Sequence, residues 1–201
     1  MNGMCLLKGT MINLSNGKSK PIEEIDYTDE VICWDFDNGK YEKTRPFWIK
    51  KAQTNTFYWI NKFESGKEIR TTGTVAGHRF FNIDKGKFLY NIECVGDLCY
   101  TKDGPDRLLE AKYVEGECEF YNIYTNYHMN LFANRILTGF RYNNLYPIKD
   151  MKFVKDGRAK RSKEEFKSIP DSWFYGMRCS EQTDSVEDIT SYVLSREIIK
   201  K

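Results

Sequence analysis

The chain has 201 residues, with 31 lysines and arginines against 29 aspartates and glutamates and a formal net charge of +2. This balance excludes a protein that binds nucleic acid through a general basic excess. Hydrophobic residues make up 40% of the chain and aromatic residues 15%, which predicts a folded core. No apolar run is long enough for a membrane-spanning helix, and the N-terminus has no secretory pattern. We therefore expect a cytoplasmic location on synthesis, and neither nucleic acid nor a membrane as a partner.

The cysteine pattern argues against a metal site. The chain has six cysteines, none of them in a C-x-x-C pair, and two histidines. A zinc site is therefore not expected, and no motif indicates a cofactor. Without an export signal we expect reduced thiols, with a local bridge between Cys94 and Cys99 as an alternative.

Residues 5 to about 140 carry the signals of β-strands. Turn pairs such as Asn16-Gly17 and Asn38-Gly39 separate short stretches of β-branched and aromatic residues, for example Val31 to Trp34. This pattern predicts a mainly β fold of many short antiparallel strands. Within it, Pro21 to Ile25 predicts one short helical turn.

The last part of the chain has a different pattern. Ser162 to Glu165 fits a helix capping box, and Asp184 to Glu187 repeats that pattern before apolar residues spaced along one helical face. We therefore expect a domain over residues 5–140 and a C-terminal extension over residues 141–201 with one or two short helices.

Cys5 is the cysteine that we expect to be chemically active. Its thiol can attack the carbonyl carbon of Met4 through a five-membered transition state, which converts the peptide bond into a thioester (an N–S acyl shift). Because the amide is favoured at equilibrium, the protein must strain this bond, stabilise the oxyanion and protonate the leaving nitrogen. Threonine hydroxyls and histidine imidazoles can perform these tasks.

Two segments supply such side chains. The segment from Glu68 to Phe81 places threonines on a predicted strand and a histidine just after it, and the segment from Tyr121 to Asn134 contains the second histidine. The candidate catalytic residues are Cys5, Thr72, Thr74, His78 and His128.

Three blocks of the sequence, in this order, resemble the Hint superfamily of inteins, bacterial intein-like domains and hedgehog C-terminal domains. The first block includes Cys5-Leu6, Gly9 to Ile12, Asn16-Gly17, Lys20 to Ile25 and Asp29 to Val31. The second is Thr71 to His78 with Val95 to Leu98, and the third is Tyr121 to Leu137. The resemblance covers about residues 5 to 140. It implies the horseshoe-like Hint fold and an autoprocessing domain with Cys5 as the nucleophile.

The second block departs from the family pattern Thr-x-x-His. Five residues separate Thr72 from His78, and three separate Thr74 from it. The alignment of the strand favours Thr72 as the residue that faces Cys5, with Thr74 as the alternative.

The C-terminal junction departs further. Splicing inteins end in His-Asn followed by Cys, Ser or Thr, whereas the matching residues here are Gly139, Phe140 and Arg141. The resemblance therefore implies only the first half-reaction. Cys5 would form a thioester with an upstream polypeptide in cis, and water or another nucleophile would release it. Residues 1–4 would then be the remnant of that upstream segment.

Two alternatives remain, and the first of them predicts the same fold with an inert Cys5. One is a catalytically silent Hint fold that serves as a binding or attachment module. The other is a structural tail domain in which residues 141–201 contact a partner. A homing endonuclease is not expected, because only about 40 residues separate the second and third blocks.

Overall fold

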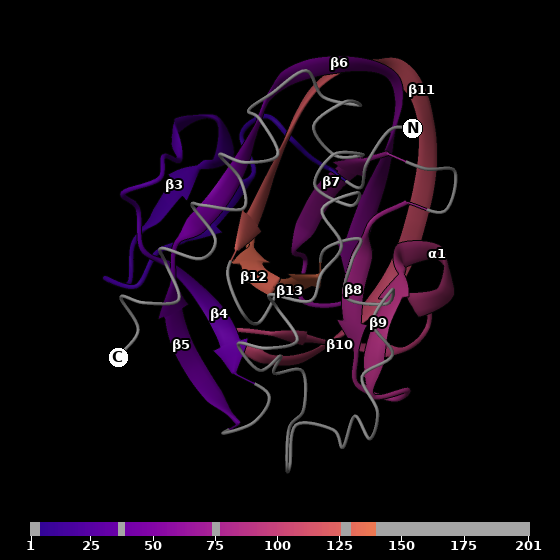
Figure 1. The fold of residues 1–201 in the computed structure, drawn as a ribbon. Coiled ribbons are helices and arrows are strands. Elements are labelled where there is room, and N and C mark those ends of the chain that lie inside the picture. Colours follow the sequence, from indigo (N-terminus) through magenta and orange to yellow (C-terminus); the bar gives the residue numbers. More distant parts are fainter. Residues whose placement is uncertain (1–4, 36–38, 74–76, 126–129, 140–201) are drawn as a thin grey trace, which may run out of the picture.

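The computed structural model describes residues 5–35, 39–73, 77–125 and 130–139 (Figure 1). The strands are β1 (Cys5–Leu7), β2 (Met11–Asn13), β3 (Ser19–Pro21), β4 (Val31–Asp35), β5 (Lys40–Thr44), β6 (Pro46–Phe63), β7 (Glu68–Thr72), β8 (Arg79–Asn82), β9 (Lys87–Tyr90), β10 (Leu98–Thr101), β11 (Gly104–Thr125), β12 (Asn130–Ala133) and β13 (Ile136–Gly139). A 3-10 helix, η1 (Ile22–Glu24), and a short helix, α1 (Asn91–Cys94), complete the described elements.

This inventory confirms the mainly β, antiparallel prediction and the helical turn after Pro21. The helices expected in residues 141–201 lie outside the described residues. Within the described ranges, no helix has the length and apolar character needed to cross a membrane.

Most strands belong to a single 11-stranded sheet. Its order is β1-β7-β6-β11-β10-β8-β13-β12-β2-β3, with β9 paired to β8. β1 pairs with β11 as well as with β7, and β10 pairs also with β13, so the sheet closes on itself at two places. β4 and β5 form a separate two-stranded sheet. The N-terminal strand is therefore held on both sides.

Two strands are much longer than the sequence predicts. β6 has 18 residues and β11 has 22, and the two arch together across the molecule (Figure 1). Their pairing shifts register at several points, including one between Glu115 and Cys118. Each irregularity bends the strands and interrupts the alternation of side chains. The prediction of many short strands holds for the other described strands but missed these two, because one bent strand has the sequence pattern of several short ones.

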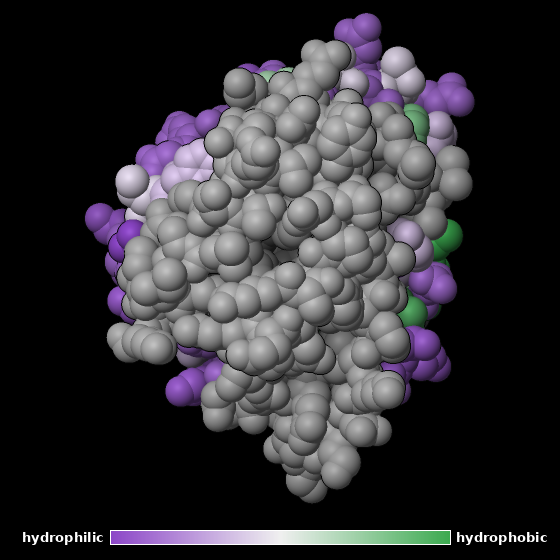
Figure 2. All heavy atoms as spheres, in the orientation of Figure 1, coloured by the Kyte–Doolittle hydropathy of each residue, from purple (hydrophilic) through white to green (hydrophobic). Residues whose placement is uncertain are grey.

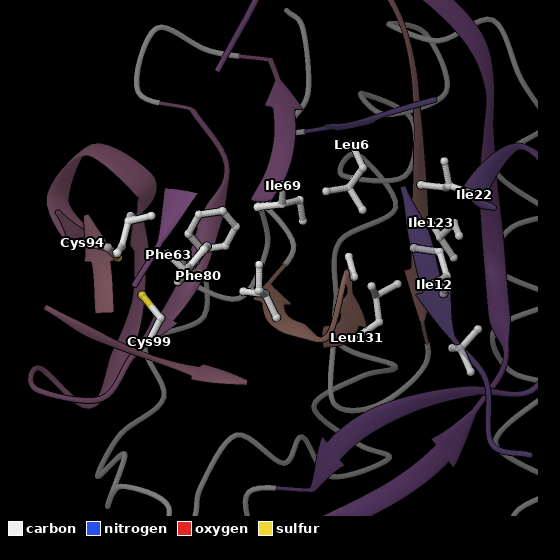
Figure 3. Packing of buried hydrophobic residues seen from close by; sticks show 14 of the residues in the cluster. Leu6, Ile12, Ile22, Phe63, Ile69, Phe80, Cys94, Cys99, Ile123 and Leu131 are labelled. Atoms are coloured by element: carbon white, nitrogen blue, oxygen red, sulfur yellow. The ribbon is translucent and has the colours of Figure 1, made fainter. Parts of the chain in front are cut away.

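The core lies between the layers of this bent sheet. Figure 3 shows Leu6, Ile12, Ile69 and Ile123 converging from β1, β2, β7 and β11, and all four are buried. A second buried cluster is mainly aromatic and contains Trp34, Phe81, Phe88, Phe132 and Leu137. The burial of Leu6 matters for the site, because it anchors the strand that begins at Cys5.

No disulfide joins the described cysteines. Cys94 and Cys99 lie side by side in the core (Figure 3), yet both are free thiols. The hydrogen bond with Cys94, together with burial, raises the pKa of the Cys99 thiol. The alternative of a local bridge between them was therefore wrong.

The described part of the surface is mainly polar. Figure 2 shows hydrophilic residues along both margins of the visible face, with isolated hydrophobic residues on one margin. The exposed large hydrophobic residues are Met11, Tyr41, Ile92, Val95, Leu109 and Tyr113. Such scattered residues are ordinary and do not mark a binding surface.

Candidate active site

Cys5 begins the first strand and is held between two neighbours. It is fully buried and lies directly opposite Thr72 in the antiparallel pair of β1 and β7. On the other side of β1, Leu6 pairs with Tyr121 of β11. Directly opposite residues in such a pair have Cβ atoms about 5 Å apart on the same face. The Cys5 thiol and the Thr72 hydroxyl therefore belong to one small space at the point where the chain enters the sheet.

Thr72 lies at the centre of a polar cluster beside Cys5. Its hydroxyl donates to the Phe57 carbonyl at 2.7 Å and accepts from Asn55 Nδ2 at 2.8 Å. The Cys118 thiol donates to the same carbonyl at 3.4 Å. Burial raises the pKa of Cys118, while its hydrogen bond with Thr72 works in the opposite direction. The sequence singled out neither Cys118 nor Asn55 as a site residue.

His78 is buried as a neutral ring. Its Nδ1 lies 2.9 Å from the backbone nitrogen of Arg79 and 3.3 Å from the Arg79 carbonyl oxygen. The shorter contact favours Nδ1 as an acceptor, with the ring proton on Nε2. Burial lowers the pKa of His78 to about 4. The Arg79 carbonyl, to which a protonated Nδ1 could donate, raises the pKa in part, and the charge of Arg79 lowers it. At neutral pH the imidazole is therefore uncharged and presents an N–H donor at Nε2.

Two buried amides connect His78 with the strand of Thr72. The backbone N–H of Asn91 donates to the carbonyl of His78 at 2.7 Å. Asn91 Nδ2 donates to Asn61 Oδ1 at 2.5 Å, and Asn61 Nδ2 donates to Thr71 Oγ1 at 3.2 Å. Since Thr71 precedes Thr72, the chain of contacts spans both sides of the Thr-His block.

Comparison with solved structures identifies this architecture. A bacterial intein-like domain from Clostridium thermocellum matches with a TM-score of 0.59 and 21% identity, over 67% of this chain and 97% of that one. A DnaB intein from Synechocystis sp. PCC 6803 matches with a TM-score of 0.56 and 19% identity, over 68% and 98%. The TvoVMA intein matches with a TM-score of 0.57 and 15% identity, over 68% and 97%.

The chain has the Hint fold. No protein-family model matches the sequence, and no curated protein matches it significantly. At these identities the likeness establishes the fold, and the activity has to be argued from the site.

Within the Hint fold, the third sequence block lies beside the first. Asn122 of β11 is buried one residue beyond the pair of Leu6 and Tyr121, which brings it next to the Cys5 end of β1. Sequence reasoning missed Asn122, although its position within the third block was a usable signal.

Two candidate residues, Thr74 and His128, lie outside the described residues. The ends of the segment that contains His128 are close together, because Thr125 Oγ1 donates to the Asn130 carbonyl at 3.0 Å. The register of β1 and β7 places Thr72, the favoured threonine, opposite Cys5. In the described ranges no group of three or more His, Cys, Asp or Glu side chains is arranged to hold a metal ion.

The C-terminal end of the Hint core is packed differently. Gly139 ends β13 and pairs with Arg79 on one side and Asn130 on the other. A Cβ at Gly139 would lie 2.5 Å from Cδ1 of Phe88, which is fully buried. The aromatic ring therefore occupies the space that any side chain at position 139 would need.

Proposed function

We propose that this Hint domain cleaves the peptide bond between Met4 and Cys5 through a thioester and thereby releases an upstream polypeptide. The observation that carries the proposal is the placement of Cys5, which is buried at the first residue of a strand directly opposite Thr72. The carbonyl of the preceding residue is covalently tied to this position, so the attack needs no diffusional encounter.

The reaction proceeds in two steps. The Cys5 sulfur bonds to the carbonyl carbon of Met4, the C–N bond breaks, and the thiol proton ends on the departing nitrogen. Water then attacks the thioester, which releases the upstream chain as a carboxylate and restores the thiol. Without such resolution the thioester returns to the favoured amide.

Two described side chains assist the first step. The neutral His78 ring donates its Nε2–H to the nitrogen of the scissile peptide bond. This nitrogen becomes basic as the C–N bond breaks, and the donated hydrogen bond assists its departure. The Thr72 hydroxyl, which donates to the Phe57 carbonyl in this structure, turns to the oxyanion that forms beside Cys5.

Splicing is not part of the proposal. The resemblance aligns Gly139 and Phe140 with the His-Asn pair of splicing inteins, and neither offers an amide or an imidazole. The packing of Phe88 against Gly139 supports the same reading, since a histidine at position 139 would collide with that ring.

Intact mass tests the proposal. A small stable domain is fused before Met1, and the mass of the fusion is followed over time with and without dithiothreitol or hydroxylamine. We expect release at the bond between Met4 and Cys5, acceleration by both reagents, and no release in Cys5→Ala.

Cys33→Ala is the matched control, because Cys33 is equally buried but lies in the separate hairpin of β4 and β5. It should cleave as the parent does. Equal cleavage in Cys5→Ala and the parent would contradict the mechanism. A fusion of unchanged mass under all conditions would support the silent attachment module instead.

A further inference from the structure

Asn61 of β6 and Asn91 at the start of α1 form a buried amide pair. Both residues are 0% exposed, and Asn91 Nδ2 donates to Asn61 Oδ1 at 2.5 Å. Asn61 Nδ2 also donates to the Ile69 carbonyl at 3.0 Å and to Thr71 Oγ1 at 3.2 Å. The pair is thus fixed to β7 on one side.

On its other side, the pair holds the backbone of His78. The N–H of Asn91 donates to the His78 carbonyl at 2.7 Å. Gly77 packs directly on the Asn91 amide, because a Cβ at Gly77 would lie 1.8 Å from Asn91 Oδ1. Gly77 also has a φ of +80°, which glycine adopts readily. These contacts hold the histidine end of the Thr-His block against the start of α1.

The pair is costly if its only role is to fill the core. Asn91 Oδ1 is buried and has no hydrogen-bond partner among the described residues. A buried acceptor without a partner destabilises a fold, and an apolar side chain would avoid that penalty. A polar pair kept at such a position is better explained by what it holds in place.

We propose that Asn61 and Asn91 are positioning residues that set His78 at its working distance from the strand of Cys5 and Thr72. The inference rests on the proposed function, because it assigns these residues a role in that reaction. The two amides link Thr71, on the threonine side of the block, with His78 on the other side.

The experiment is a double-mutant cycle on the upstream fusion, read as the rate of thiol-induced release. Asn91→Ala removes the bond to Asn61 but keeps the backbone bond to His78. Because misplacing a reacting group by about 1 Å can cost about 10²-fold, we expect a loss of that order in the parent background. In the His78→Ala background the same substitution should change the rate less than about twofold, because a residue that acts through His78 has nothing left to position.

Asn13→Ala is the matched control. Asn13 is buried and makes two side-chain hydrogen bonds, to Ser19 Oγ and from the backbone N–H of Arg135, far along the sheet order from β7. It should lower the stability but leave the release rate of the folded protein unchanged. Equal losses for Asn91→Ala in both backgrounds, or no loss in the parent background, would overturn the proposal. If Asn91→Ala does not fold, Asn61→Ala enters the same cycle with the same expected outcomes.

A second readout separates this inference from the proposed function. If the parent fusion never cleaves, the function fails, and imidazole ¹⁵N NMR of the intact domain decides the positioning role. We expect the ring signals of His78 to be the same in the parent and in Asn13→Ala, and to shift or broaden in Asn91→Ala because the ring is no longer held in one position. Unchanged ring signals in Asn91→Ala would overturn the inference, and His128→Gln assigns the signals.

Discussion

The N-terminal and C-terminal ends of the Hint core lie in the same sheet but differ in the side chains that they bring there. At the first end, Cys5 brings a thiol to the side of the Thr72 hydroxyl, within a cluster of polar side chains. At the last end, Gly139 brings no side chain, and the Phe88 ring fills the space beside it. Packing can therefore fill the space at one end of a fold while the other end keeps the groups that a reaction needs.

His78 connects the two ends, since its neighbour Arg79 pairs with Gly139. The histidine itself is joined through Asn91 to the strand of Thr72. If the domain cleaves only the peptide bond before Cys5, substitutions of His78 should affect cleavage at that end alone.

The largest expected effect belongs to His78→Ala. Loss of the imidazole should slow release at the bond before Cys5 by about 10²–10⁴-fold, the usual size of general acid–base assistance. The measurement is the rate of thiol-induced release from the upstream fusion, taken on protein shown to be folded. An unchanged rate would remove His78 from the site.

Thr72→Val should have the next largest effect. The substitution keeps the shape of the side chain but removes the hydroxyl that lies opposite Cys5. We expect a loss of about 10²–10³-fold in the release rate, as for the removal of one oxyanion donor. Thr74→Val, measured in parallel, should retain the parent rate, and the reverse result would identify Thr74 as the residue that faces the nucleophile.

The buried histidine should also make stability depend on pH. The pKa of His78 is about 4 in the folded protein and near 6.5 when unfolded, so the unfolded state binds more protons between these values. Stability should be complete above pH 6.5, fall by about 3 kcal/mol as the pH drops to 4, and lose nothing more through His78 below that.

Urea unfolding of the parent and of His78→Asn between pH 7 and pH 4.5 measures this term. The variant should lose less stability than the parent over that range. The ion pair of Asp103 with Arg135 does not interfere, because the pKa of Asp103 is about 2 and its stabilising effect is lost only at lower pH. Parallel curves for the two proteins would show that His78 is charged or exposed in the folded state.

The smallest expected effect is a loss of stability at the Gly139 end of the Hint core. Gly139→Ala places a Cβ against the Phe88 ring and should cost about 1–3 kcal/mol of stability through overpacking. Gly116→Ala is the control, because its nearest atom, in Tyr58, is 3.6 Å away and the contact is ordinary. We expect thermal or urea unfolding to separate the two variants clearly. Equal stability would mean that the space beside Gly139 is open to a side chain.

Much of the first end could be predicted from the sequence. The motif around Cys5 and the threonine strand predicted their neighbourhood, and the register of β1 and β7 brings Thr72 to Cys5. The spacing of Thr72 and His78 showed a departure from the family pattern but not what holds the two residues in place. Asn61 and Asn91 lie 30 residues apart in sequence and meet only through the fold. An isolated asparagine carries no local signal for such a contact.

The packing at Gly139 and the length of β6 and β11 could not be predicted from the sequence, for a related reason. Gly139 reads as an ordinary glycine until the fold brings Phe88 of β9 against it. β6 and β11 read as several short strands because bulges such as the one after Glu115 break their alternation. Local patterns predict strand content, whereas register and tertiary packing decide which strands are continuous and which positions are closed.

A fusion with one tag domain before Met1 and a second after Lys201 tests most directly whether the domain cleaves only at its N-terminal end. Its products are followed by intact mass over time in the presence of dithiothreitol. The account predicts two species, the released upstream domain and a Hint domain that still carries the downstream tag. A ligated product of the two tags, or release of the downstream tag with the upstream bond intact, would contradict it.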